Sequence, residues 1–542
     1  MELVIVIRFS EPRQHPWEQH LSDTIQPSDG TADSTSDVVG NLDPAVTNDK
    51  PDPKRWLALA VIAVAQLMIV LDASIVNIAL PSAQRDLNIS DADRQWVVTA
   101  YTLAFGGLLL LGGRIADYMG RKRTFVIGLL GFAAASALGG IASTAGLLYA
   151  ARGLQGAFAA LMAPAALSLI SVTFTLPKER ATAFGVFGAI AGGGAAIGLI
   201  LGGVLTEYAS WRWCLGVNVP IALITAWAAS RVVRESKATG NTKYDIPGAI
   251  LVTAGLVSLV YGFTEAAKLK NPGQGGEVLG WTAPTTVTFL VIAVVLLVAF
   301  VWWEGHTEHP LLPLRVALDR NRGGSYLVFL FIGAGLFAMF LFLTFYFQGT
   351  LGYSPLKSGF AFLPFSLGII LTAGVVSQLL PRLGPRPIMI PGLIMATLGM
   401  LWLTQITPDT SYWTHILPAL LLMSIGMACV FIPASSTALV GIGTHDAGVA
   451  SALLNTSQQV GGSLGTALLN TLYASAVTGY LATNLNGGAD RESVTQLALV
   501  RGYHVAFFWG AVMLGLALLV AVFLMNAKKD DVPADAAAAA AV

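Results

Sequence analysis

The chain has 542 residues, of which 55% are hydrophobic and only 11% are charged, and its formal net charge is zero. Soluble globular domains carry about 25% charged residues, so this composition excludes an ordinary soluble domain. A zero net charge gives no basic field that would attract nucleic acid, and we expect no nucleic-acid partner.

The first 52 residues differ from the rest of the chain. Residues 10–52 are rich in Pro, Asp, Ser and Thr and have no helical periodicity, which predicts disorder. The run LVIVI at residues 3–7 is too short to span a membrane, and no signal-peptide cleavage site follows it. We expect residues 1–52 and 528–542 to be disordered cytoplasmic tails, and the first of them to be dispensable.

Fourteen apolar stretches, each long enough to cross a bilayer, follow residue 55. A helix needs about 20 apolar residues to span the hydrocarbon, and lipid offers no hydrogen bonds, so each stretch must be helical. The sequence therefore predicts an all-α integral membrane protein of the cell membrane. The expected spans are 57–80, 96–112, 124–144, 147–174, 182–205, 213–230, 246–264, 281–303, 325–348, 358–380, 387–407, 412–436, 448–475 and 503–526.

Lysine and arginine predict the orientation, because they are enriched in cytoplasmic loops. With the N-terminus placed inside, 20 of them lie in or beside cytoplasmic segments and 8 lie in outer loops. An even number of spans then puts both termini in the cytoplasm.

Glycine patterns recur at nearly constant distances along the chain. GAAIG at 194–198 is followed 267 residues later by GGSLG at 461–465, and Gly156 and Gly120 have counterparts 270 and 264 residues further on. These offsets predict a duplicated six-helix unit whose two copies share one orientation, a parallel repeat. The expected parts are an N-terminal half, a two-helix insert and a C-terminal half, at 53–235, 236–322 and 323–527.

Only two formal charges, Asp72 and Arg152, lie inside the fourteen spans. A charge at such a position costs at least about 2.5–3.5 kcal/mol, so it needs a structural or functional reason. Asp72 lies roughly 24 Å along its span at 1.5 Å per residue, and Arg152 lies near the outer end of its own, so the two can meet in the outer third. One interpretation is an ion pair that fixes packing. The other is a proton site, because burial favours the protonated acid while a nearby arginine favours the ionised one.

The loop after the second span contains glycine, acid and base at short spacing. Gly113 and Gly120 permit tight turns and close helix approach, and Asp117 can accept hydrogen bonds from helix amides or pair with Arg121. The alternative is that the basic run of residues 121–123, which includes Lys122, only anchors the cytoplasmic end of the helix.

The fifth span is dense in glycine. Gly194, Gly198 and Gly202 line one face, with Gly203 beside them. Small residues four positions apart let membrane helices pack backbone to backbone, and simple close packing is one interpretation of this pattern.

Five motifs occur in order along residues 55–527. They are LDASIVNIALP at 71–81, GRIADYMGRKR at 113–123, RGLQG at 152–156, WRW followed by NVP at 211–220, and PLLPL at 310–314. Together with the fourteen spans, they resemble the fourteen-helix drug:proton antiporters (EmrB/QacA type) of the major facilitator superfamily.

The resemblance implies a proton-coupled exporter that rocks between two six-helix halves and carries hydrophobic drugs, toxins or a self-made antibiotic. It implies that Asp72 accepts the proton and that Arg152 modulates it. It assigns a hinge to the glycines of the fifth span, although Leu199 stands where the family has proline, so the helix should bend less. The implied cytoplasmic gate consists of Gly113, Arg114, Asp117, Gly120, Arg121, Lys122 and Arg123, and the implied hinge of Gly194, Gly198, Gly202 and Gly203.

Amides and aromatic rings within the spans are candidates for a substrate cavity, because such cavities combine apolar walls with a few polar groups. Hydrogen bonding between helices is the alternative. No second acid accompanies Asp72 in the spans, which favours a neutral, monocationic or weakly acidic amphiphile over a dication. The candidates are Asn77, Gln155, Phe337, Phe340, Gln378, Asn455 and Gln458.

Other classes of function find little support in the sequence. We recognise no metal cluster, nucleotide loop or Ser/His/Asp set, so we expect neither an enzyme nor a cofactor. The two cysteines, Cys214 and Cys429, are interpreted as core residues. The nearest alternative is an exporter dedicated to one endogenous metabolite, antibiotic or lipid. We expect the exporter to be a monomer.

Overall fold

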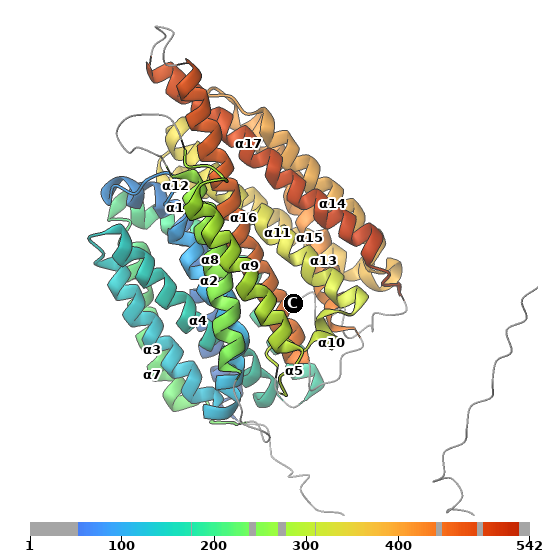
Figure 1. Cartoon of the computed structure of the whole chain (residues 1–542). Helices are drawn as coiled ribbons and strands as arrows, with labels where there is room; N and C mark the ends of the chain where they lie inside the picture. The colour runs from blue at the N-terminus through green and yellow to red at the C-terminus, as the bar shows by residue number, and fades with distance from the viewer. Residues whose placement is uncertain are drawn as a thin grey trace, which may run out of the picture. The chain divides into compact units, whose positions relative to one another are not determined.

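The structure is a computed structural model that describes residues 53–174, 176–237, 245–268, 278–308, 310–440, 447–484 and 491–529. Within these ranges the chain folds almost entirely into helices (Figure 1). The predicted disordered tails, 1–52 and all but the first two residues of 528–542, lie outside the described residues.

The helices follow the chain in two long series. The first series is α1 (Arg55–Asp86), α2 (Trp96–Met119), α3 (Arg121–Gly140), α4 (Ala145–Thr173), α5 (Pro177–Tyr208), α6 (Trp213–Gly216), α7 (Asn218–Val232), α8 (Ile246–Ala267) and α9 (Pro284–Glu304). The second is α10 (Leu314–Ala317), α11 (Arg320–Phe345), α12 (Pro355–Ala361), α13 (Leu363–Leu383), α14 (Pro385–Trp402), α15 (Leu417–Leu439), α16 (Ala447–Asn484) and α17 (Arg491–Leu519).

A helix lies at each of the fourteen predicted ranges, and twelve helical segments are long and apolar enough to cross a membrane. α5 and α16, which are 32 and 38 residues long, are not among the twelve. The all-α, multi-pass class is therefore confirmed for the described residues, whereas the count of fourteen spans stays a prediction.

Local sequence signals set where several helices begin. The side chains of Thr144, Asp245, Asp319 and Ser354 accept hydrogen bonds from first-turn amides of α4, α8, α11 and α12. These side chains satisfy amides that have no partner within the helix. Proline stands at one of the first two positions of α5, α8 and α9, where its missing N–H is not needed.

Two similar turns join α2 to α3 and α13 to α14. Gly120 and Gly384 adopt φ angles of 109° and 80° in them, a backbone conformation that favours glycine. The predicted repeat pairs these two residues with each other, and the shared conformation agrees with that pairing.

Glycines also allow the closest approach between helices, and they do so alike at two places. α5 packs on α1 at Gly198, where an added Cβ would lie 2.9 Å from the Leu71 carbonyl oxygen. α16 packs on α11 at Gly465, where an added Cβ would lie 2.8 Å from the Ala334 carbonyl oxygen. Both helix pairs therefore pack backbone to backbone at these glycines, while the duplicated unit stays a prediction.

α8 and α9 form a pair at the side of the other helices. They pack on each other, and α8 also contacts α2 and α16 (Figure 1). α9 leaves a row of apolar side chains exposed, including Val291, Val294 and Val298, as expected for a helix whose outer face meets lipid. The division into halves and insert stays a prediction, with contacts between the predicted halves running through α2 and α16, α5 and α12, and α1 and α11.

Candidate functional site

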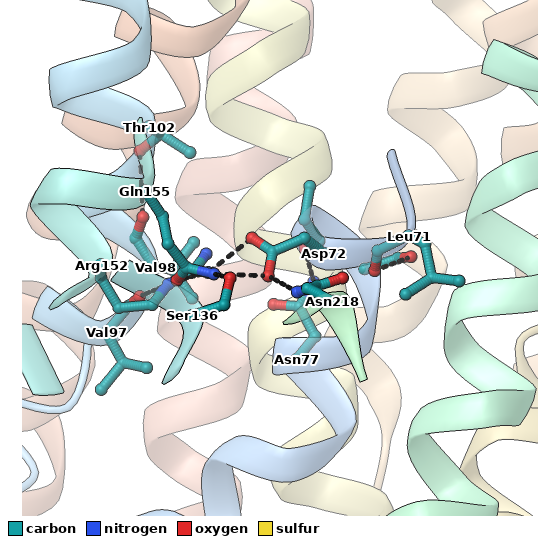
Figure 2. Close-up of polar contacts among 12 residues, drawn as sticks. Leu71, Asp72, Asn77, Val97, Val98, Thr102, Ser136, Arg152, Gln155 and Asn218 are labelled. Atoms are coloured by element: carbon teal, nitrogen blue, oxygen red, sulfur yellow. Dashed lines mark hydrogen bonds and ion pairs between the residues drawn. The ribbon is translucent and has the colours of Figure 1, made fainter. Parts of the chain in front are cut away.

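The two charges predicted inside the spans meet. Asp72 lies within α1 and Arg152 lies in the second turn of α4, and their side chains are 0% and 1% exposed. Arg152 Nη1 donates to Asp72 Oδ2 at 2.6 Å (Figure 2). A charge-assisted contact of this length, out of reach of solvent, places both formal charges in one buried pair.

Arg152 is held by more than the carboxylate. Its Nε donates to the carbonyl oxygen of Val97 at 2.9 Å, and Nη1 also donates to Gln155 Oε1 at 2.9 Å. The guanidinium carbon lies 4.4 Å from the centre of the Tyr101 ring, a cation–π arrangement. Contacts with α2 and α4 thus hold the guanidinium in the position from which it binds Asp72 of α1.

The second oxygen of Asp72 binds two amides. Gln155 Nε2 donates to Asp72 Oδ1 at 3.0 Å, and Asn218 Nδ2 donates to the same oxygen at 2.7 Å. Gln155 Nε2 also lies 2.8 Å from Ser136 Oγ on α3. Figure 2 shows Gln155 and Arg152 on one side of the carboxylate and Asn218 on the other.

Asn218 is a site residue that the sequence analysis quoted only within a motif. It begins α7, is fully buried, and its own Oδ1 has no hydrogen-bond partner among the described residues. The signal available in the sequence was an amide side chain at the start of an apolar stretch, because a polar group buried there normally has a hydrogen-bond partner. We call Asp72, Arg152, Gln155 and Asn218 the carboxylate network.

The network can hold an ionised carboxylate without solvent. Both Asp72 oxygens accept hydrogen bonds, and the neighbouring guanidinium balances the charge. A void of about 10 Å³ borders Arg152, with Trp211 and Cys214 in its wall, which is close to the smallest space that holds one water molecule. The pair is therefore nearly sealed from solvent in this structure.

Residues 113–123, predicted as a loop, form the end of α2, the turn at Gly120 and the start of α3, and we keep the name 113–123 loop for them. Arg121 Nη2 lies 2.9 Å from Asp117 Oδ1, so the predicted pairing of these two residues is found. Two first-turn amides of α3, those of Lys122 and Arg123, donate to the carboxylate of Glu235, at 3.0 and 3.1 Å. The role of this loop as a cytoplasmic gate stays a prediction.

The backbone conformation at position 120 favours glycine, and the side chain of Glu235 lies close to it. An added Cβ at Gly120 would lie 2.7 Å from the Glu235 carboxyl carbon, and the positive φ disfavours other residues as well. Arg114 is half-buried on α2, and Gly113 faces Pro164 across α4. Sequence reasoning missed Glu235 because it lies more than 110 residues from the loop that it caps.

The glycines of α5 meet two different neighbours. Gly194, Gly198 and Gly202 face Val70, Ser74 and Ile75 of α1, in accord with close packing within the predicted N-terminal half. Gly203 faces α12, where an added Cβ would lie 2.6 Å from Leu356 Cα. α5 is one continuous helix through Leu199, and its role as a hinge stays a prediction.

The predicted cavity residues are spread over different surroundings. Gln155 belongs to the buried network, and Asn77 and Asn455 donate to carbonyl oxygens of their own helices. Phe340 packs against Phe362 and Phe365 with ring centres 5.1 and 5.4 Å apart. Phe337 lies against Gly462, Gln458 is half-buried and Gln378 is exposed, so a substrate role for this set stays a prediction.

A second buried guanidinium joins the predicted halves. Arg94, just before α2, is 2% exposed, and its Nε donates to Asn470 Oδ1 of α16 at 3.2 Å. Its guanidinium carbon lies 3.8 Å from the ring centre of Phe345 and 4.7 Å from that of Tyr473. Asn470 Nδ2 in turn donates to the Asp91 carbonyl oxygen at 2.8 Å. We call these five residues the seam.

Residues 62–466, which include both buried arginines and the 113–123 loop, match the profile of the Major Facilitator Superfamily. The match covers most of the chain and includes both residues of the buried ion pair. The protein belongs to the Major Facilitator Superfamily.

Several relatives bear names that refer to antibiotics. The chain is 48% identical to the puromycin resistance protein pur8 of Streptomyces alboniger, over 89% of this chain and 93% of the relative. It is 38% identical to the cephamycin export protein CmcT of Amycolatopsis lactamdurans, over 78% of this chain and 86% of the relative.

Solved structures share the fold at lower sequence identity. A bacterial homologue of the human lysosomal transporter Spinster, in an inward-facing and unoccupied conformation, matches with a TM-score of 0.60 at 15% identity. The match covers 88% of this chain and 98% of that one. It shows that the two chains have the same fold.

Proposed function

We propose that the protein is an efflux transporter that exchanges small hydrophobic or amphiphilic compounds for protons. The observation that carries the proposal is the buried Asp72–Arg152 pair, since an acid inside a membrane protein is by default a functional group. The relatives named for puromycin resistance and cephamycin export support the direction of transport.

A proton would act on the pair directly. In the described geometry, Asp72 accepts from three side chains and is held as the carboxylate. Protonation removes its attraction for Arg152, which keeps its contacts with the Val97 carbonyl oxygen and Gln155. A guanidinium released from its counter-charge then favours a different packing of α4 against α1, and this is the link we propose between proton binding and movement.

The seam and the 113–123 loop would then be the two gates. The seam closes the end of the bundle where α1 ends and α2 begins, and the loop lies at the opposite end. Under the proposed orientation, with both termini in the cytoplasm, the described state is closed to the outside. Asp117 is paired with Arg121 of its own half, which fits a latch that is not engaged with the other half.

The remaining architecture is part of the same proposal. We infer fourteen spans that include α5 and α16, two six-helix halves at 53–235 and 323–527, and an insert at 236–322. A transporter of this kind is complete as a monomer, because each chain contains both halves. The fourteen-helix drug:proton antiporters remain the subgroup that this arrangement fits.

Proton movement in everted membrane vesicles tests the proposal. Addition of a transported compound, with puromycin as the first probe, should release protons from vesicles that contain the natural protein. Asp72→Asn should abolish this response because an amide cannot take up the proton. Asp86→Asn, which removes an acid at the exposed end of the same helix, is the matched control and should respond normally.

Size-exclusion chromatography of both variants verifies that they are folded. A folded Asp72→Asn variant with undiminished proton release would contradict the role of Asp72. Transport without any proton release from the natural protein would contradict coupling itself.

A dedicated exporter of one endogenous compound is the second candidate function. It is favoured by the relatives whose names each refer to a single antibiotic or antibiotic class. Growth of a deletion strain against a panel of compounds separates the two, because a broad exporter protects against several unrelated structures and a dedicated one against a single structure.

A further inference from the structure

Two carboxyl groups lie buried next to each other, far along the chain from the carboxylate network. Asp245 immediately precedes α8 and is 5% exposed, and Glu304 is the last residue of α9 and is 3% exposed. They occupy the end of the insert at which α8 begins and α9 ends.

One oxygen of each carboxyl group has protein donors. Asp245 Oδ1 accepts from the Gly248 amide at 2.9 Å and from Trp303 Nε1 at 2.7 Å. Glu304 Oε2 accepts from the amide of Leu312 at 2.9 Å. These bonds fix both side chains and attach the linker after α9 to the pair.

The other oxygen of each group has no donor among the described residues, and the two converge on one place. A Cβ atom added at Gly248 would lie 2.4 Å from Asp245 Oδ2 and 2.8 Å from Glu304 Oε1. Two ionised oxygens in this position would repel each other while both lack hydrogen bonds and solvent. That combination is strongly unfavourable in a buried site.

We propose that Asp245 and Glu304 together bind one proton, held between Asp245 Oδ2 and Glu304 Oε1. A protonated carboxyl group is a donor, so a single proton supplies the missing hydrogen bond to both oxygens and removes the repulsion. Carboxyl pairs at short distance commonly share a proton for this reason.

The neighbouring charges do not replace that proton. Burial and the charge of Asp245 at the start of α8 both disfavour an ionised Glu304 at the end of α9. On the linker, His306 Nδ1 lies 2.7 Å from the Trp302 carbonyl oxygen, and Glu308 is exposed. Ca²⁺ takes about six to eight oxygen ligands, whereas only two bare oxygens converge here, and the described residues hold no cluster of three metal-ligating side chains.

The shared proton joins three parts of the chain. It ties the start of α8 to the end of α9, and through Leu312 it ties both to the linker that leads to α10 and α11. Loss of the proton makes the carboxylates repel and weakens the anchor of the linker. The site therefore responds to proton concentration independently of Asp72, and it stands even if the proposed transport function does not.

Infrared spectroscopy of the purified full-length protein tests this directly. A protonated carboxyl group has its own C=O absorption, which shifts in heavy water. At neutral pH the natural protein should show such a band that Glu304→Gln removes. Glu308→Gln, an exposed acid on the same linker, is the matched control and should leave the band intact.

Thermal unfolding in detergent gives a second readout. A proton bound in the folded state stabilises at low pH, and this contribution is lost as the pH rises through the range in which the pair ionises. Between about pH 7 and 9, where buried glutamates are known to ionise, the unfolding midpoint of the natural protein should fall more than that of Glu304→Gln. The glutamine amide replaces the proton as a donor at every pH.

Three results would overturn the proposal. One is the absence of any band sensitive to Glu304→Gln. Another is an identical pH profile for the natural protein and this variant. The third is a midpoint that rises with sodium or potassium at constant pH in the natural protein but not in the variant, which would make the ligand a cation. If Glu304→Gln fails to fold, Asp245→Asn replaces it, because its amide also donates to the pair.

Discussion

Arg152 and Arg94 are both almost fully buried, yet their surroundings differ in kind. Arg152 faces a buried carboxylate and stays among helices of the predicted N-terminal half. Arg94 joins helices of both halves through an amide and two aromatic rings. Its acid partner, Asp91, is 3.3 Å away and more than half exposed.

The difference separates two uses of a buried charge. A guanidinium that depends on a buried acid is tied to the ionisation of that acid, because neither charge is tolerated alone. A guanidinium held by rings and a neutral amide, with its acid partner exposed to solvent, depends less on protonation and more on the position of the element that carries those groups. The first is suited to chemistry, and the second to holding one arrangement of the halves.

The largest effect is expected from Arg152→Ala. The change leaves Asp72 buried with two amide donors and no counter-charge, and breaking a buried pair in this way costs about 3–5 kcal/mol. Thermal unfolding in detergent should show a strongly lowered midpoint. The double variant Asp72→Asn, Arg152→Ala removes both charges and should recover much of the loss, and with the single variants Asp72→Asn and Arg152→Ala it completes a double-mutant cycle.

This double-variant cycle isolates the interaction between the two residues. If Arg152→Ala unfolds at the same temperature as the natural protein, the pair contributes nothing that depends on its charges. The contrast between the two arginines would then have no energetic basis.

A smaller effect is expected from Arg94→Ala, and it should concern accessibility more than stability. Desolvated cation–π contacts are worth up to about 2 kcal/mol each, and removing them with the hydrogen bond to Asn470 should loosen the seam. Ala474 is a buried residue of α16 next to Tyr473. A cysteine in its place, in a background where the two natural cysteines are alanine, should then react about tenfold faster with an impermeant maleimide.

Lysine at position 94 sharpens this test. It keeps the charge but lacks the planar group that stacks on Phe345, so Arg94→Lys should behave more like alanine than like arginine. Arg85→Ala, which removes an exposed arginine from the nearby end of α1, should leave labelling unchanged. Equal labelling in all four proteins would show that Arg94 does not hold the seam closed.

The two arginines also show how far the sequence reaches. Arg152 could be found because a charge inside an apolar span needs a reason, and helical rise placed it at the depth of Asp72. Arg94 lies in a polar stretch that predicts an outer loop, and its burial comes from Phe345 and Tyr473, some 250 and 380 residues away. The helices could be predicted too, because a run of apolar residues is visible in the local sequence.

Contacts made by distant segments explain the other residues that sequence reasoning missed. Glu235 caps α3, and Asn218 binds Asp72 across 146 residues of chain. The residues around Glu235 and Asn218 form no pattern from which the distant partner could be predicted. Only the packed helices bring these groups together, so the composition of the carboxylate network could be predicted in part and its geometry could not.

The smallest effect is expected at a third arginine, which is neither buried nor between the halves. Arg55, the first residue of α1, pairs with Glu179 near the start of α5 at 2.8 Å, with both side chains about one-fifth to one-quarter exposed. The hydrogen bond from Arg55 lowers the pKa of Glu179, partial desolvation opposes the shift, and the arginine charge adds to the lowering. A lowered pKa in the folded state means a stabilisation that is present above the ordinary pKa of glutamate and is lost as the pH falls through the lowered value.

Glu179→Gln should therefore unfold slightly below the natural protein at about pH 7, and the two should converge toward pH 3–4, below the ordinary range of glutamate. Added salt should shrink the difference at neutral pH, because exposed pairs are screened. Salt should leave the effect of Arg152→Ala nearly unchanged, since that pair is shielded from solvent. If salt reduces both effects equally, burial does not distinguish the network from the surface, and the graded order of the three arginines fails.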